Sequence, residues 1–207
     1  GHMIHTSLAF LTQQINDYLK LMTDDSETDR IFLTSVATES SGVMIPDSSL
    51  GLSLINIEEE RFFKDQTTSI INREGITEQR NPEVKLNLYV LISANFQDKK
   101  DPDPIDDYVE GLKQLSYVIS FFQSKNVFTP DNSPAMSGID PELRKLVVEL
   151  YSYSFEQLYN FWSVVGAKYL PSVLYRIRMI RFQEGAVKST ALPIEKIGIN
   201  SHGASRG

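Results

Sequence analysis

The densest group of titratable side chains in a predicted element is Glu58, Glu59 and Glu60, at the end of a strand. Carboxylates that converge on one point can bind a divalent cation or serve as acid and base in hydrolysis. Successive side chains of a strand point to opposite faces, so Glu58 and Glu60 share one side and Glu59 takes the other. The three cannot all converge on one ion. We therefore interpret them as a solvated strand end, with a divalent-metal site as the alternative.

A second cluster consists of arginines in the segment YRIRMIRF, namely Arg176, Arg178 and Arg181. Arg176 and Arg178 fall on one face of the predicted last strand. Arginine is enriched at protein interfaces because its planar head presents five hydrogen-bond donors. These three residues are our predicted protein interface, and a solvent-exposed strand face is the alternative.

The remaining residues argue against catalysis. The chain has no cysteine, which excludes disulfides, thiolate metal sites and thiol nucleophiles. Apart from His2, its histidines are His5, near the start, and His202, near the end, and neither lies in a motif. The sequence contains no Gly-rich phosphate loop, nucleophile elbow or zinc-spaced histidine pair. It predicts no enzyme activity, no catalytic or metal-binding residue and no cofactor.

The composition is that of one packed domain. The 207 residues are 41% hydrophobic and 23% charged, with a net charge of -7. The negative net charge disfavours binding to nucleic acid. No apolar run reaches the ~20 residues that a membrane-spanning helix requires. We expect residues 1–3 to be a tag remnant plus the start methionine, residues 4–183 to form the domain, and residues 184–207 to be a flexible tail rich in Gly, Ser and Ala.

Hydrophobic periodicity supplies the elements that position these side chains. Helices are predicted over the first twenty residues, from about residue 106 to Lys125, and over 155–165, where Gly166 ends the last helix. Strands are predicted at 31–36, 52–60, 84–96, 143–153 and 172–183, with a long surface loop at 64–83. The middle helix should bury the stripe Val109, Leu112, Leu115, Ile119 and Phe122. In the last helix, the aromatic residues Phe155, Tyr159, Phe161 and Trp162 are interpreted as core.

This element order favours a single α+β domain, because adjacent strands pair antiparallel and the helices must then cover one or both faces of the sheet. The clearest strand alternates over 84–96. We expect Leu86, Leu88, Val90 and Ile92 to share a core with Ile119 and Phe122 of the middle helix.

Four stretches carry a family resemblance: INIEEER (55–61), LNLYVLISANF (86–96), LSYVISFFQSKNVFTPDNSP (115–134) and WSVVGAKYLPSVLYRIRMI (162–180). With the helical start MIHTSLAFL, they resemble the N-terminal-type domain, long of unknown function, of the tail-terminator or cap proteins of extracellular contractile injection systems. These are phage-tail-like particles of the antifeeding-prophage and virulence-cassette kind. The resemblance covers about residues 3 to 183.

The resemblance implies a tail-terminator-like fold and a structural subunit that caps tube and sheath as a hexameric ring. It implies tube and sheath proteins as partners, synthesis in the bacterial cytoplasm, and a place in an assembled, releasable particle. It transfers no catalytic residue. Two other classes remain open: a monomeric module that binds a protein or peptide through the same fold and, more remotely, a carboxylate hydrolase using Glu58 to Glu60.

Overall fold

The protein is described from a computed structural model. The structure describes residues 3–38, 40, 42–60, 68–71, 74–75, 77–80, 83–97 and 104–182. The predicted tail, 184–207, and the first two residues lie outside this part of the chain. None of the helices within it is long and apolar enough to cross a membrane.

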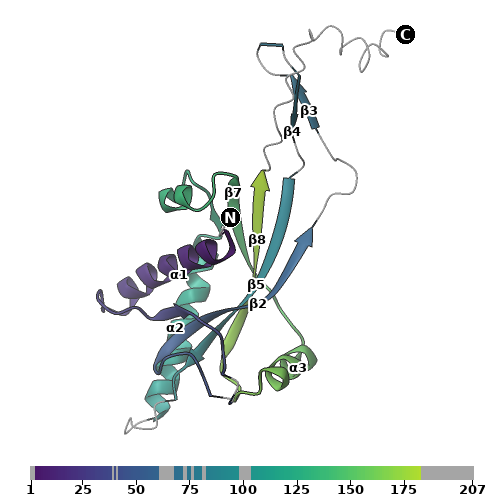
Figure 1. The fold of residues 1–207 in the computed structure, drawn as a ribbon. Coiled ribbons are helices and arrows are strands. Elements are labelled where there is room, and N and C mark those ends of the chain that lie inside the picture. Colours follow the sequence, from purple (N-terminus) through teal and green to yellow (C-terminus); the bar gives the residue numbers. More distant parts are fainter. Residues whose placement is uncertain are drawn as a thin grey trace.

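A six-stranded sheet forms the centre of the molecule, in the order β1-β2-β5-β8-β7-β6. Only β1 and β2 are parallel, and every other neighbouring pair of this sheet is antiparallel. The strands are β1 (Ile31–Leu33), β2 (Ser49–Glu60), β5 (Glu83–Asn95), β6 (Val127–Phe128), β7 (Leu143–Leu150) and β8 (Ser172–Phe182). A separate two-stranded sheet joins β3 (Thr68–Ile71) to β4 (Thr77–Arg80). Figure 1 shows that pair beyond the ends of β2 and β5.

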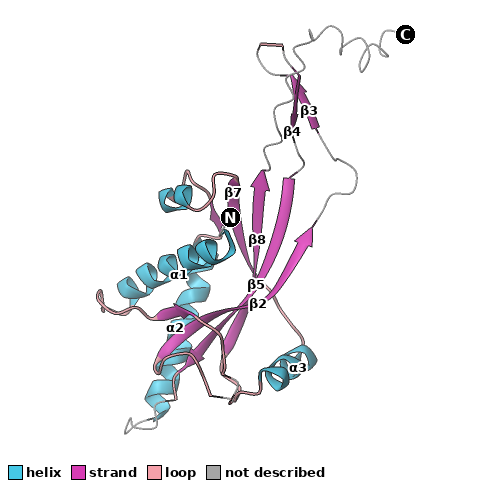
Figure 2. Ribbon diagram, viewed as in Figure 1, coloured by secondary structure: helices cyan, strands magenta, loops and turns pink. Residues whose placement is uncertain are grey.

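The helices cover both faces of the central sheet, which confirms the α+β prediction (Figure 2). The helices α1 (Met3–Met22) and α2 (Pro104–Ser124) pack on one face, and α3 (Phe155–Val165) packs on the other. A short 3-10 turn, η1 (Pro134–Gly138), precedes β7. In α3 the Ser154–Gln157 capping box fixes the start, and Gly166 ends the helix at φ 74°, in the predicted left-handed conformation.

Alternation along β5 divides its side chains between two cores. Leu88, Val90 and Ile92 are buried with Phe122 under α1 and α2, as the sequence predicts. Leu86 is partly buried against the same cluster. Leu91 points the other way and packs with Leu174 and Trp162 of the core beneath α3.

The predicted stripe of α2 was only half correct. Leu115 and Phe122 are buried, but Val109 and Leu112 are 42% and 40% exposed, and Ile119 is half-buried. The helix instead buries Val118 and Phe121. The buried face of α2 is therefore rotated about the helix axis relative to the predicted stripe. Gly111 explains this rotation, because its missing side chain lets the ring of Phe96 pack directly against the helix. When a helix has apolar residues on several faces, hydrophobic periodicity is compatible with more than one buried stripe. The packing contacts in the folded protein then decide which stripe is buried.

Three further predictions needed correction. In α3, Trp162 is buried and Phe161 is partly buried, but Phe155 and Tyr159 are 90% and 73% exposed, because the helix packs on the sheet through the stripe Leu158, Phe161, Trp162 and Val165. The strand predicted at 31–36 ends at Leu33. Within the predicted loop 64–83, the described residues pair as β3 and β4.

Candidate functional site

The predicted arginines lie at different places on β8. Arg176 and Arg178 project from the α3 side of the sheet, as their spacing predicts. Arg181 falls on the opposite face, where it contacts Glu142 (2.8 Å) and Asp140 (3.5 Å). The structure therefore brings two of the three together and separates the third.

Strand order places carboxylates on both sides of this arginine pair. Arg176 stands directly across from Glu149 of β7 and from Tyr89 of β5. Arg178 stands across from Asn87, which in turn faces Glu58 of β2. Two rows of mostly polar side chains thus run across the strands β2, β5, β8 and β7, and Glu60 lies in the next row. We call this set the ionic face: Glu58, Glu60, Asn87, Tyr89, Glu149, Arg176 and Arg178.

The contacts of the ionic face form one connected network. The Arg176 guanidinium donates to Glu149 at 2.6 Å. Arg178 lies 3.6 Å from Glu149 and 3.5 Å from Glu60. Asn87 Nδ2 donates to Glu60 at 2.7 Å and to Glu58 at 3.2 Å. Glu58 and Glu60 therefore share a side, as alternation predicts.

The network also shifts protonation. The hydrogen bond from Asn87, together with Arg178 and Lys85, lowers the pKa of Glu60 below its usual range. The hydrogen bond to Glu149 raises the pKa of Arg176. By residue type, the face carries two cations, Arg176 and Arg178, and three anions, Glu58, Glu60 and Glu149. Three buried atoms, Asn87 Oδ1 and the Nε atoms of Arg176 and Arg178, have no hydrogen-bond partner within the described residues.

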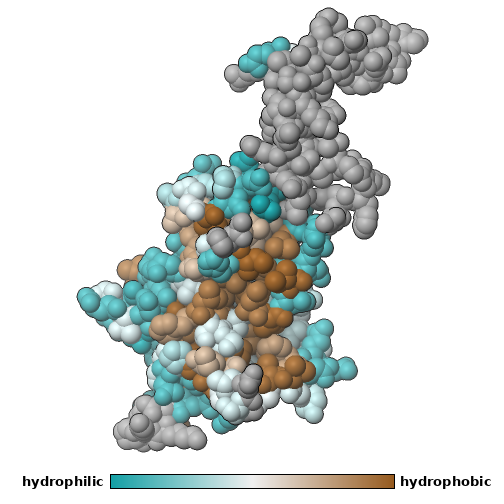
Figure 3. Space-filling model, in the orientation of Figure 1, coloured by the Kyte–Doolittle hydropathy of each residue, from teal (hydrophilic) through white to brown (hydrophobic). Residues whose placement is uncertain are grey.

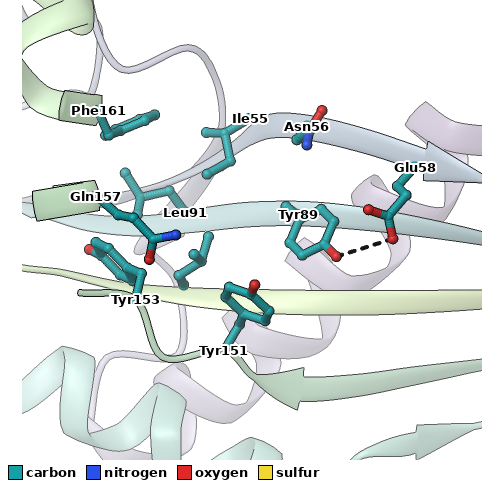
Figure 4. A pocket seen from close by; sticks show the side chains of 10 residues that line it. Ile55, Asn56, Glu58, Tyr89, Leu91, Tyr151, Tyr153, Gln157 and Phe161 are labelled. Carbon is teal, nitrogen blue, oxygen red and sulfur yellow. Dashed lines mark hydrogen bonds between the residues drawn. The ribbon is translucent and has the colours of Figure 1, made fainter.

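A groove of about 280 Å³ opens beside the ionic face, between the sheet and α3. Figure 4 shows its floor, formed by Ile55, Tyr89 and Leu91, and its α3 wall, formed by Gln157 and Phe161. Tyr151 and Tyr153 come from the segment between β7 and α3, and the Tyr151 ring meets that of Tyr89 edge-on at 5.3 Å. The Tyr89 hydroxyl bonds to Glu58 at 3.4 Å, where the groove meets the ionic face.

This arrangement suits protein contact better than catalysis. The volume is at the low end for a small-molecule site, and the lining is aromatic with polar tips. The described residues contain no group of three or more His, Asp or Glu side chains placed to hold a metal. Sequence reasoning missed Glu149, Asn87 and Tyr89, because only the strand order brings them beside the arginines.

Comparison with known proteins gives a family match over most of the chain. The model of the Pvc16 N-terminal domain matches residues 8–196. No curated protein sequence matches the chain.

Two solved structures match at low identity. One is the tube-terminating cap of the anti-feeding prophage, with 13% identity and a TM-score of 0.44. The other is the sheath/tube terminator, in its extended state, of PVC, an extracellular contractile injection system, with 14% identity and a TM-score of 0.46. Each match covers 84% of this chain but only 56% and 57% of the respective solved chains.

Proposed function

The chain belongs to the family of the Pvc16 N-terminal domain, and from that membership we propose that it is a structural terminator subunit of a phage-tail-like contractile injection system. The observation that carries the proposal is the family match over residues 8–196. The match includes all four stretches that resemble terminator proteins. In this role the protein ends the growth of tube and sheath and performs no chemistry.

We further propose that the subunit works as a six-fold ring on the particle. A closed ring repeats one interface around its axis and leaves no open contact, which suits a component that stops a polymer. Its other partners are the last tube and sheath rings. The protein is made in the bacterial cytoplasm and becomes part of the assembled particle.

The part of the ionic face formed by Arg176, Arg178 and Glu149, with the adjoining groove, is the surface that we assign to the tube or sheath partner. Arg176 and Glu149 are about one-third exposed, so both can also reach a second protein. α3 also carries the exposed aromatic residues Phe155 and Tyr159, outside the groove. Aromatic and arginine side chains contribute most of the binding energy in many interfaces. Arg181 lies outside this surface, and its role in contact with a partner is a separate prediction.

Deletion of the gene tests the function. Particles lacking the protein should carry tubes or sheaths of uncontrolled length, whereas normal capped particles would contradict the proposal. Replacing Arg176 and Arg178 together by Ala tests whether this surface binds the tube or sheath partner. Lys113→Ala, at an exposed position of α2, is a control that also removes positive charge. Capping should fail only in the arginine variant. If both variants cap normally, the arginines merely form a solvated strand face.

One observation favours a second candidate, a monomeric module that binds a peptide. The groove lined by Tyr89, Tyr151 and Tyr153 could accept an extended segment. Such a module would bind its peptide as an isolated monomer, and its gene would lie away from genes for sheath, tube and baseplate. Gene neighbours of those kinds would favour the terminator.

A further inference from the structure

The central sheet has two lightly protected edges. At one edge, β1 pairs only with Leu50 to Leu52, so no described strand pairs with the outer side of β2 from Leu54 to Glu60. At the other edge, β6 pairs only with Leu146 and Val147 of β7. Unpaired strand edges offer backbone donors and acceptors to another chain. Among the described residues, both edges therefore include strand backbone that has no strand partner.

Exposed apolar side chains accompany both edges. On β2, Leu54 and Ile57 are 36% and 47% exposed. On the opposite edge, Val127 and Leu150 are exposed as well. Figure 3 shows apolar surface across the middle of the visible face, in the region where Figure 1 draws β2 and β5. Such side chains gain by being covered in an assembly.

At the level of Glu60, the charges of the two edges are opposite. Glu60 on β2 pairs with Lys85, Lys85 with Ile180, and Ile180 with Lys145 on β7. Glu60 and Lys145 thus end one row of residues on the α3 side. Glu58 adds negative charge to the β2 edge, and Arg144, next to Lys145, adds positive charge to the β7 edge. Lys145 is exposed and has no ion pair within the described residues.

We propose that the β2 edge, Leu54–Glu60, binds the β7 edge around Lys145 of a second copy, head to tail around the ring. The inference rests on the proposed ring, and it names the surface by which neighbours meet. A rotation about an axis roughly along the strands leaves their direction unchanged. Because β2 and β7 run in opposite directions, β2 of one copy then lies antiparallel to β7 of the next.

Contact between edges of opposite charge also reduces the electrostatic repulsion between acidic copies. Each copy carries -7, so contact between identical acidic surfaces would be repulsive. Two β2 edges facing each other would bring Glu58 and Glu60 of both copies together. Pairing unlike edges removes that repulsion, and a head-to-tail contact is the kind that closes into a ring.

The first test is zero-length cross-linking of the assembled protein with a carbodiimide. This reagent joins a carboxylate and an amine in direct contact through an amide bond. Within one copy, Glu60 and Lys145 are separated by three strand spacings, or roughly 14 Å, so a bond between them must link two copies. We expect mass spectrometry of purified particles to find a cross-linked peptide pair containing Lys145 and Glu58 or Glu60. A ring whose cross-links place Lys145 on other carboxylates would overturn the inference.

The second test exchanges the charges. Glu60→Lys and Lys145→Glu should each lower the fraction of subunits in rings several-fold, and the double exchange should restore much of it. Lys168→Glu, an equally large change at an exposed site away from both edges, is the matched control and should leave assembly unchanged. Circular dichroism of each variant separates a lost contact from a lost fold. Folded single variants that assemble normally would contradict the edge contact.

These outcomes separate the inference from the proposed function. Particles that remain capped by rings while both tests fail would retain the terminator and refute this interface. If the edges cross-link in the free protein but deletion leaves particles normally capped, self-association stands and the terminator role falls.

Discussion

Substituting Gly111 by Ala probes how α2 packs against the sheet. A Cβ at this buried position would lie 2.9 Å from Cγ and Cδ1 of the Phe96 ring and 3.0 Å from its Cβ. Phe96 is itself buried, so its ring cannot swing into solvent to make room. Overpacking of this kind costs about 1 to 3 kcal/mol. Alanine in place of glycine inside a helix returns about 1 kcal/mol. The net expectation is a destabilisation between about 0 and 2 kcal/mol.

Gly138→Ala is the matched control, because nothing lies within 4 Å of the added methyl group. It should change stability by less than about 0.5 kcal/mol. Urea unfolding can be followed through the chain's one tryptophan, Trp162, which α3 buries against the sheet. The midpoint should fall for Gly111→Ala with an unchanged slope. In a Phe96→Ala background, which removes the two ring contacts but keeps the Cβ at 3.0 Å, the same substitution should cost less than in the wild-type background. Stabilisation of the wild-type background by about 1 kcal/mol would refute the close packing.

Further predictions concern the core and the titrating groups. Leu88→Ala, in the buried centre of β5, should lower the free energy of unfolding by about 2 to 5 kcal/mol. Leu112→Ala, at an exposed position of α2, should lower it by less than about 0.5 kcal/mol in the same assay. Equal losses would contradict the finding that Leu112 lies outside the buried face of α2. The pKa of Glu60 is lowered in the folded state, so its contribution to stability is present above its ordinary pKa of 4.5 and is lost as pH falls through the folded pKa; Glu60→Gln should flatten the acid side of the stability curve. Burial raises the pKa of Tyr175 from 10.0 to about 12, so its contribution is full below pH 10 and is lost as pH rises towards 12. Tyr175→Phe should remove that alkaline loss, and phenolate absorbance can follow the titration.

Local sequence patterns were sufficient for much of the fold. Apolar spacing predicted α1 over the first twenty residues, strict alternation predicted β5, and Gly166 marked the end of α3. The same spacing failed for α2, because several of its faces are apolar and the contact between Gly111 and Phe96 decides which one is buried. It failed for α3 because the helix packs through Leu158, Phe161, Trp162 and Val165, which leaves Phe155 in solvent.

Less of the candidate site than of the fold could be predicted from the sequence. Alternation correctly paired Glu58 with Glu60 and Arg176 with Arg178, but the predicted interface also included Arg181, which the structure places on the opposite face. The sheet order β2-β5-β8-β7 then brings together residues that lie up to 120 positions apart in the chain. No local pattern reveals this order. The charged residues at the two sheet edges were visible in the sequence, but their common level depends on the register of four strands.

The most direct test of the terminator proposal is to image the ends of assembled particles by electron cryomicroscopy. We predict a six-fold ring at the end of tube and sheath, with density that fits the six-stranded sheet and the three helices of the described domain. We also predict that this ring is absent when the gene is deleted. Particle ends that lack this domain, or keep the same ring after deletion, would contradict the account.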